Sequence, residues 1–156
     1  MISAVDYKKI SIALSLAAFN IIIGSIVSFF KLPIYLDTIG MVVSTVILGW
    51  RYGLFCGVVT LIGGFFFINP YFPFYVMNMI SIVVVTELLR KFNMFANIFK
   101  AIVSGLLIAV MGAIVSAPVT AYLFEGSTLS GNDAITAYFV STGNNILNSV
   151  LFSGAE

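Results

Sequence analysis

Apolar residues fill five long stretches of this chain, and the few charged residues stand mostly at the ends of those stretches. The first stretch, Ile10 to Phe30, holds 21 uncharged residues, which is enough for one helix across a hydrocarbon core of about 30 Å. The 35 uncharged residues from Tyr52 to Thr86 are too many for one span. The run Asn69-Pro70-Tyr71-Phe72-Pro73 divides them, because proline lacks the backbone donor that a helix interior needs. The pattern predicts membrane-spanning helices joined by short turns.

We therefore predict an all-α integral membrane protein, a compact bundle of about six transmembrane helices in a single transmembrane domain, residues 1–156. The approximate spans are residues 9–30, 38–50, 52–68, 73–91, 96–123 and 134–155. The last span is polar for a lipid-facing helix, because it carries Asn144, Asn145 and Asn148. It either crosses the membrane as a sixth span or lies partly at the outer surface, in which case a true last helix follows Glu156.

The positions of lysine and arginine predict the orientation, since short cytoplasmic loops are enriched in both residues. With the N-terminus in the cytoplasm, the inner ends of the spans carry Lys8, Lys9, Arg51, Arg90, Lys91 and Lys100. The outer ends carry Lys31 alone, beside the acids Asp37, Glu125 and Asp133. Six basic residues against one favour a cytoplasmic N-terminus.

Composition agrees with a membrane location and excludes several function classes. Of the 156 residues, 61% are hydrophobic and only 8% are charged, whereas a soluble domain has about 25% charged residues. The chain has no histidine, so it can form neither a Ser-His-Asp triad nor an HExxH zinc site. Its single cysteine, Cys56, cannot form an internal disulfide, and a net charge of +1 offers no basic stripe for nucleic acid. We expect no catalytic residue, no metal and no cofactor.

Small residues at four-residue spacing predict close helix packing, because helices in lipid associate where their backbones can approach. Three such ridges occur: Ala13 and Ala17; Gly49, Gly53 and Gly57; and Gly105, Ala109, Ala113 and Ala117. All three ridges can simply pack the bundle internally. The Ala13–Ala17 pair lies in the predicted cytoplasmic half of the first helix, which leaves open the docking of a partner helix there.

Uncharged polar and aromatic side chains gather toward the predicted outer side, a combination that suits a pocket for a small, largely neutral ring compound. We predict nine substrate-binding residues: Tyr35, Asp37, Asn69, Tyr75, Asn78, Tyr122, Asn144, Asn145 and Asn148. Each of these residue types also has a structural explanation that needs no ligand. Asp37 is also a good N-cap for the second span, the asparagines can bond between helices, and the tyrosines can form an interfacial belt. Glu87 is followed by Arg90 and Lys91, a spacing that predicts an ion pair at the inner end.

The order of several short motifs resembles the substrate-capture subunits (S components) of energy-coupling factor (ECF) vitamin importers. The motifs are Leu36-Asp37-Thr38-Ile39-Gly40, Leu48-Gly49-Trp50-Arg51-Tyr52-Gly53-Leu54-Phe55-Cys56-Gly57, Ile62-Gly63-Gly64, Asn69-Pro70, Asn78, Ser116-Ala117-Pro118-Val119, Gly131 and Thr142-Gly143. Ala13 and Ala17 match the motif by which such subunits dock their membrane coupling partner. The similarity covers most of the chain, and the pattern looks most like subunits for vitamin B6 or thiamine-related pyrimidines.

The resemblance implies a six-helix protein of the bacterial cytoplasmic membrane that binds a vitamin in an outward-facing pocket, closed by the loop between the first two helices. It implies association with a transmembrane coupling (T) protein and two cytoplasmic ABC ATPases. It also implies a further apolar helix after Glu156. The chain has no GxxxxGK[ST] phosphate loop, so the energy would come from those partners. A second hypothesis is a small membrane scaffold or assembly subunit without a transported ligand.

Overall fold

The computed structural model describes residues 4–32, 36–124 and 133–155, and these residues form helices joined by turns. The helices in chain order are α1 (Ala4–Phe29), α2 (Ile39–Leu48), α3 (Trp50–Phe67), the 3-10 helix η1 (Phe72–Tyr75), α4 (Val76–Lys91), α5 (Ile98–Leu123), α6 (Asp133–Ser141) and α7 (Ile146–Ala155). No strand is present in the described part of the chain, which confirms the all-α prediction.

Four segments are long and apolar enough to cross a membrane: α1, α3, η1 with α4, and α5. Only 17–28% of each apolar window is buried inside the protein, so most of this apolar surface faces outward. Outward-facing apolar surface on this scale is what a helix presents to lipid. The prediction of a membrane protein is thereby supported, while the total of about six spans and the orientation stay predictions.

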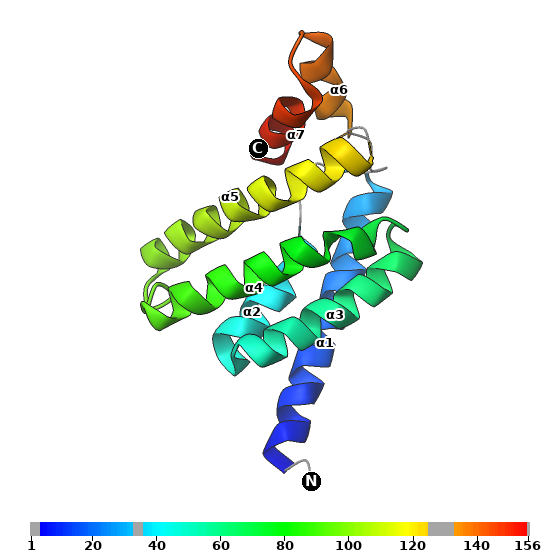
Figure 1. Cartoon of the computed structure of the whole chain (residues 1–156). Helices are drawn as coiled ribbons and strands as arrows, with labels where there is room; N and C mark the ends of the chain where they lie inside the picture. Colours follow the sequence, from blue (N-terminus) through cyan, green and yellow to red (C-terminus); the bar gives the residue numbers. More distant parts are fainter. Residues whose placement is uncertain (1–3, 33–35, 125–132, 156) are drawn as a thin grey trace.

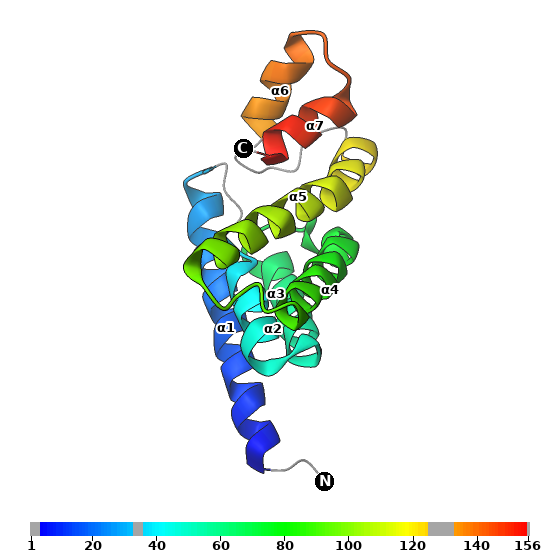
Figure 2. The same ribbon diagram turned by 90° about the vertical axis from the view of Figure 1, so that its left-hand side faces the viewer.

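Helices α1 to α4 pack together, and α5 packs against α4 (Figure 1). α1, α2 and α3 pack against one another, and α4 packs on both α2 and α3. Buried Met41, Cys56, Met79 and Val83 form the core between them. α5 packs along α4 and carries the short helices α6 and α7 at its far end, away from the N-terminus of the chain (Figures 1 and 2).

Two of the expected spans differ in the structure. α2 has 10 residues, or about 15 Å of helix, half the thickness of a hydrocarbon core. The expected last span is divided into α6 and α7 at Gly143, whose φ of 92° ends a helix in the left-handed region. Asn144 and Asn145 follow in that turn. Two of the three asparagines that made the last stretch unusual in the sequence therefore lie where the helix breaks, and Asn148 lies in α7.

Charged side chains at the end of α4 bond to each other and to the backbone at the start of α3. Arg90 forms a bidentate ion pair with Glu87, at 2.9 Å from Nε and 2.8 Å from Nη2, as the spacing predicted. The backbone N–H of Trp50, at the start of α3, also donates to the Glu87 carboxylate. Tyr52 donates to Asp6 over 3.2 Å, which ties α3 to the first turn of α1. Six of the seven basic residues lie near the helix ends on this side of the bundle. Lys8 and Lys9 are near the start of α1, Arg51 is at the start of α3, Arg90 and Lys91 are at the end of α4, and Lys100 is at the start of α5.

Candidate functional site

A cavity of about 500 Å³ lies between the helices and takes lining residues from α1 to α5. This volume falls in the usual range for small-molecule pockets, about 300–1,000 Å³. Its walls change in character along its length. Ser28, Asp37, Asn69, Tyr71 and Thr120 line the end where α1, α3 and α5 finish, whereas the opposite end is lined by Ile82, Phe95, Ala101 and Ile108. The cavity is polar at one end and apolar at the other.

Small side chains on α5 leave room for this cavity. Gly105, Ala109 and Ala113 all line it, and a Cβ added at Gly105 would meet no atom within 4 Å. The ridge predicted for helix packing therefore faces open space along most of its length. Only its last member, Ala117, is packed, in a small core with Ala121 of α5 and Val150 of α7. The glycine ridge on α3 packs internally instead, since Gly53 lies against Thr45 and Gly57 lies against Met79 and Met41.

Asn20 is a fully buried amide in the middle of α1 that joins three helices at the cavity wall. Its Oδ1 accepts the Gly40 backbone N–H at 2.7 Å, and its Nδ2 donates to Thr60 Oγ1 at 3.2 Å. Gly40 is in the first turn of α2, where backbone N–H groups have no partner within the helix. The sequence-based prediction missed Asn20. Its signal was a lone amide within 21 uncharged residues, since such a group needs a partner in an apolar setting.

Asp37 lines the polar end of the cavity, in the turn between α1 and α2. It does not cap α2: Thr38 occupies the N-cap position, without a side-chain cap bond. Within the described part of the chain, the Asp37 carboxylate accepts a hydrogen bond from its own backbone N–H. Burial raises the pKa of this carboxyl above its ordinary value, and that backbone bond opposes the shift. The capping explanation for Asp37 is thus not borne out.

Asn69, Tyr75 and Asn78, three more of the predicted substrate-binding residues, also line the cavity. Asn69 Oδ1 accepts the Tyr71 backbone N–H at 2.8 Å, which shapes the turn after α3. The Tyr75 hydroxyl lies 2.7 Å from Thr120 Oγ1 and so links η1 to α5. Asn78 Oδ1 is buried and has no hydrogen-bond partner among the described residues. Four of the nine predicted residues therefore meet at one cavity.

Four of the other predicted residues, Tyr122, Asn144, Asn145 and Asn148, do not line this cavity. Tyr122 is 76% exposed, because it lies two residues and about 200° of helical rotation beyond Thr120. Asn144 and Asn145 are exposed in the turn before α7. Asn148 is exposed because α7 turns Leu147, Val150 and Leu151 toward α5. Tyr35 lies outside the described residues.

The Ala13–Ala17 face is covered by the chain itself. Both alanines are 0% exposed and belong to the core that α1 forms with α2 and α3. Internal packing, the alternative to a partner-docking role, therefore accounts for both positions in this structure.

Replacing Ala17 by leucine is expected to lower the unfolding temperature and ligand binding together, because overfilling a packed core costs about 1–3 kcal/mol. The matched control is Ala18→Leu, since Ala18 is the next residue and is exposed. Thermal unfolding in detergent and a binding assay measure both quantities. If Ala17→Leu instead abolishes uptake in cells while stability and ligand binding stay unchanged, Ala17 docks a partner helix and internal packing is the wrong explanation.

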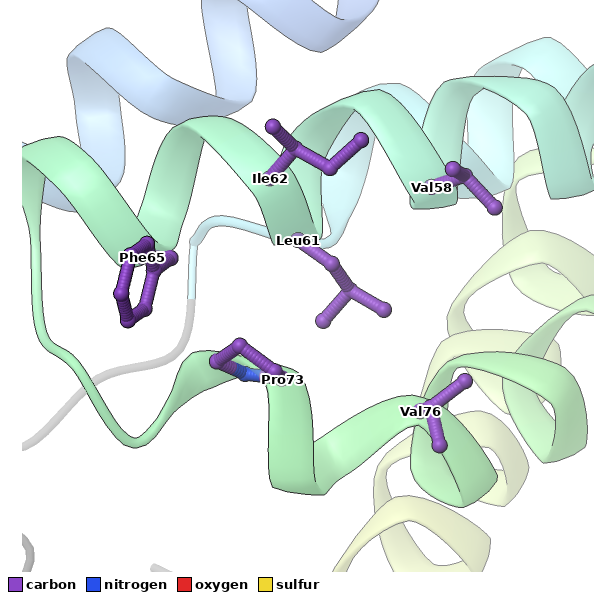
Figure 3. Close-up of a pocket in the computed structure, with 6 residues that line it drawn as sticks. All are labelled: Val58, Leu61, Ile62, Phe65, Pro73 and Val76. Carbon is purple, nitrogen blue, oxygen red and sulfur yellow. The ribbon is translucent and has the colours of Figure 1, made fainter.

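A second hollow, of about 420 Å³, lies on the outer face of α3 where η1 and α4 begin (Figure 3). Val58, Leu61, Ile62 and Phe65 of α3 line it with Pro73 and Val76. All six side chains are apolar, so nothing in this hollow would orient a polar ligand. On a membrane-facing surface, lipid chains suffice to cover it.

Comparisons with protein-family models, curated proteins and solved structures found no match to this chain.

Proposed function

We propose that this protein is the substrate-capture subunit of an ECF-type ABC importer, which binds a small water-soluble vitamin or precursor with a pyridine- or pyrimidine-like ring. The cavity of about 500 Å³ is the observation that supports this proposal most directly. It combines aromatic walls from Tyr71, Phe72 and Tyr75 with the amide of Asn78 and the carboxyl of Asp37. Apolar walls with a few placed polar groups are typical of small-molecule sites.

The scaffold hypothesis explains this interior less well. A scaffold needs its helices packed, and small residues serve it where they let backbones approach. Here Gly105, Ala109 and Ala113 face a space that no side chain of the described residues fills. The side-chain oxygen of Asn78 also has no partner among residues 4–32, 36–124 and 133–155, although such a buried group costs about 1–3 kcal/mol when unpaired. Both features suit a site that a ligand completes.

The remaining parts of the proposal follow from the resemblance and the charge pattern. The N-terminus would lie in the cytoplasm of a bacterial cell and the polar end of the cavity would open outward. A T protein and two ABC ATPases would supply the energy. If the partner docks on the first half of α1, its contacts would begin at the exposed residues beside Ala13 and Ala17, namely Ser11, Leu14 and Ser15.

The purified protein in detergent is expected to bind one compound from a panel of water-soluble vitamins and their precursors. A ligand present at 100 times its Kd stabilises the folded state by about 2.7 kcal/mol. For a chain of this length that corresponds to about 5–10 °C in unfolding temperature. If no compound in the panel shifts the unfolding temperature or binds by calorimetry, the capture hypothesis is wrong and the scaffold hypothesis gains.

A further inference from the structure

The polar groups of the cavity differ in how many hydrogen bonds they have left to offer. Asn20 uses its oxygen on Gly40 and its nitrogen on Thr60. Tyr75 and Thr120 bond to each other. The hydroxyls of Ser28 and Thr38 can either donate or accept, so they select neither kind of ligand group. Two acceptors of the described lining have no hydrogen bond to another described residue, the Asp37 carboxylate and Asn78 Oδ1, and each can accept from a ligand.

The charge of the lining is one-sided. Among the described residues that line the cavity, Asp37 is the only charged one, and none is lysine or arginine. Lys31 is the nearest basic residue to Asp37 in the sequence, and it is exposed and not part of the lining. Residues 33–35 and 125–132, which the structure does not describe, contain no lysine or arginine. A ligand in this cavity therefore meets one acid and no described base.

This arrangement discriminates between ligands by charge. A phosphate or carboxylate group would be buried near Asp37 without a counter-charge, and burying an unpaired charge is strongly unfavourable. A protonated amine gains a charge-assisted hydrogen bond from the same carboxylate. A second N–H on the ligand would satisfy Asn78 Oδ1, which has no partner in the part of the chain that the structure describes.

We propose that the cavity selects a ring compound bearing a protonated amino group, with the ammonium paired to Asp37 and a further N–H donated to Asn78 Oδ1, and that it rejects phosphorylated or carboxylated forms. This inference rests on the proposed function, because it assumes that the cavity holds the captured ligand. It goes further by assigning the charge of the ligand and the residue that recognises it.

Three forms of one ring provide the test: pyridoxamine, which carries a protonated aminomethyl group, neutral pyridoxine, and pyridoxamine 5′-phosphate. Calorimetry on the purified protein is expected to give pyridoxamine the tightest binding, about tenfold or more above pyridoxine, as one charge-assisted hydrogen bond provides. No binding of the phosphate ester is expected. The preference should vanish in Asp37→Asn, which loses pyridoxamine affinity while pyridoxine affinity stays within about threefold.

Asp37→Glu keeps the charge and should retain the order of the three compounds. Asp133→Asn removes an acid that does not line the cavity and should leave all three affinities unchanged. The unfolding temperature of each variant is the control: an unchanged temperature shows that a loss of affinity comes from the site and not from misfolding. The inference is overturned if pyridoxine or the phosphate ester binds as tightly as pyridoxamine, or if Asp37→Asn keeps the preference for pyridoxamine. Each of these results leaves the capture function standing. Tight binding of a neutral or anionic vitamin from the wider panel does the same. Only a failure of every compound to bind removes the capture function as well.

Discussion

Replacing Asn20 by leucine is expected to destabilise the bundle by about 1–3 kcal/mol, which is the cost of leaving a buried donor unpaired. The Gly40 N–H would lose its acceptor at 2.7 Å, and α2 has no side-chain cap of its own to replace it. Leucine would also remove the link to Thr60 that holds α1 against α3. Thermal unfolding in detergent should show a fall of about 2–4 °C per kcal/mol for a chain of this size.

A graded comparison makes this prediction specific. Thr60→Val removes only the hydroxyl that accepts from Asn20 Nδ2 and leaves the bond to Gly40 intact, so it should cost less than Asn20→Leu. Gly40→Ala tests the same contact from the other side, because a Cβ at Gly40 would lie 2.7 Å from Asn20 Oδ1 and would also press on the carbonyl oxygen of Leu16. If Thr60→Val is as damaging as Asn20→Leu, the capping of α2 by Asn20 has little energetic weight.

Filling the cavity from α5 is expected to abolish ligand binding while the protein stays folded. In Ala109→Phe the added ring would project from a residue that lines the cavity and is not part of a packed core. A ligand would have to share the space with that ring, so we expect affinity for pyridoxamine to fall by about 100-fold or more, equivalent to about 2.8 kcal/mol. Calorimetry measures the affinity, and the unfolding temperature reports whether the fold survives.

Leu106→Phe is the matched control for this experiment. Leu106 is on the same helix, is 63% exposed and does not line the cavity, so enlarging it should alter neither binding nor stability. Binding that persists in Ala109→Phe with an unchanged affinity would place the ligand elsewhere in the protein. Equal loss in both variants would instead indicate a general sensitivity of α5 to aromatic substitution.

Most of the helices could be predicted from the sequence because their signals are local. The charges at Lys9 and Lys31 bound the first apolar stretch, and the prolines at 70 and 73 separate α3 from α4. The Glu87–Arg90 pair followed from spacing alone, since residues three apart lie on one face of a helix. The break at Gly143 was harder to predict, because a single glycine ends a helix only when the chain can use the turn that follows.

The candidate site was only partly predictable, because it depends on helical phase and on contacts between distant segments. Asn78 and Tyr122 both looked suitable as polar or aromatic residues near the predicted outer side. The structure brings Asn78 to the cavity and turns Tyr122 outward, as its 76% exposure shows. Asn20 bonds to residues 20 and 40 positions further along the chain, and no local pattern specifies such pairs.

Sequence alone determined the helical class, the apolar surface that calls for lipid and the absence of histidine chemistry, because each of these depends on composition and on local periodicity. Only the tertiary structure decided that the alanines at 13 and 17 are covered while those at 109 and 113 line a cavity. From the sequence alone, an alanine at a packed helix contact cannot be told from an alanine that lines a cavity. The packing of neighbouring helices decides whether the space beside it is filled by another side chain or left for a ligand.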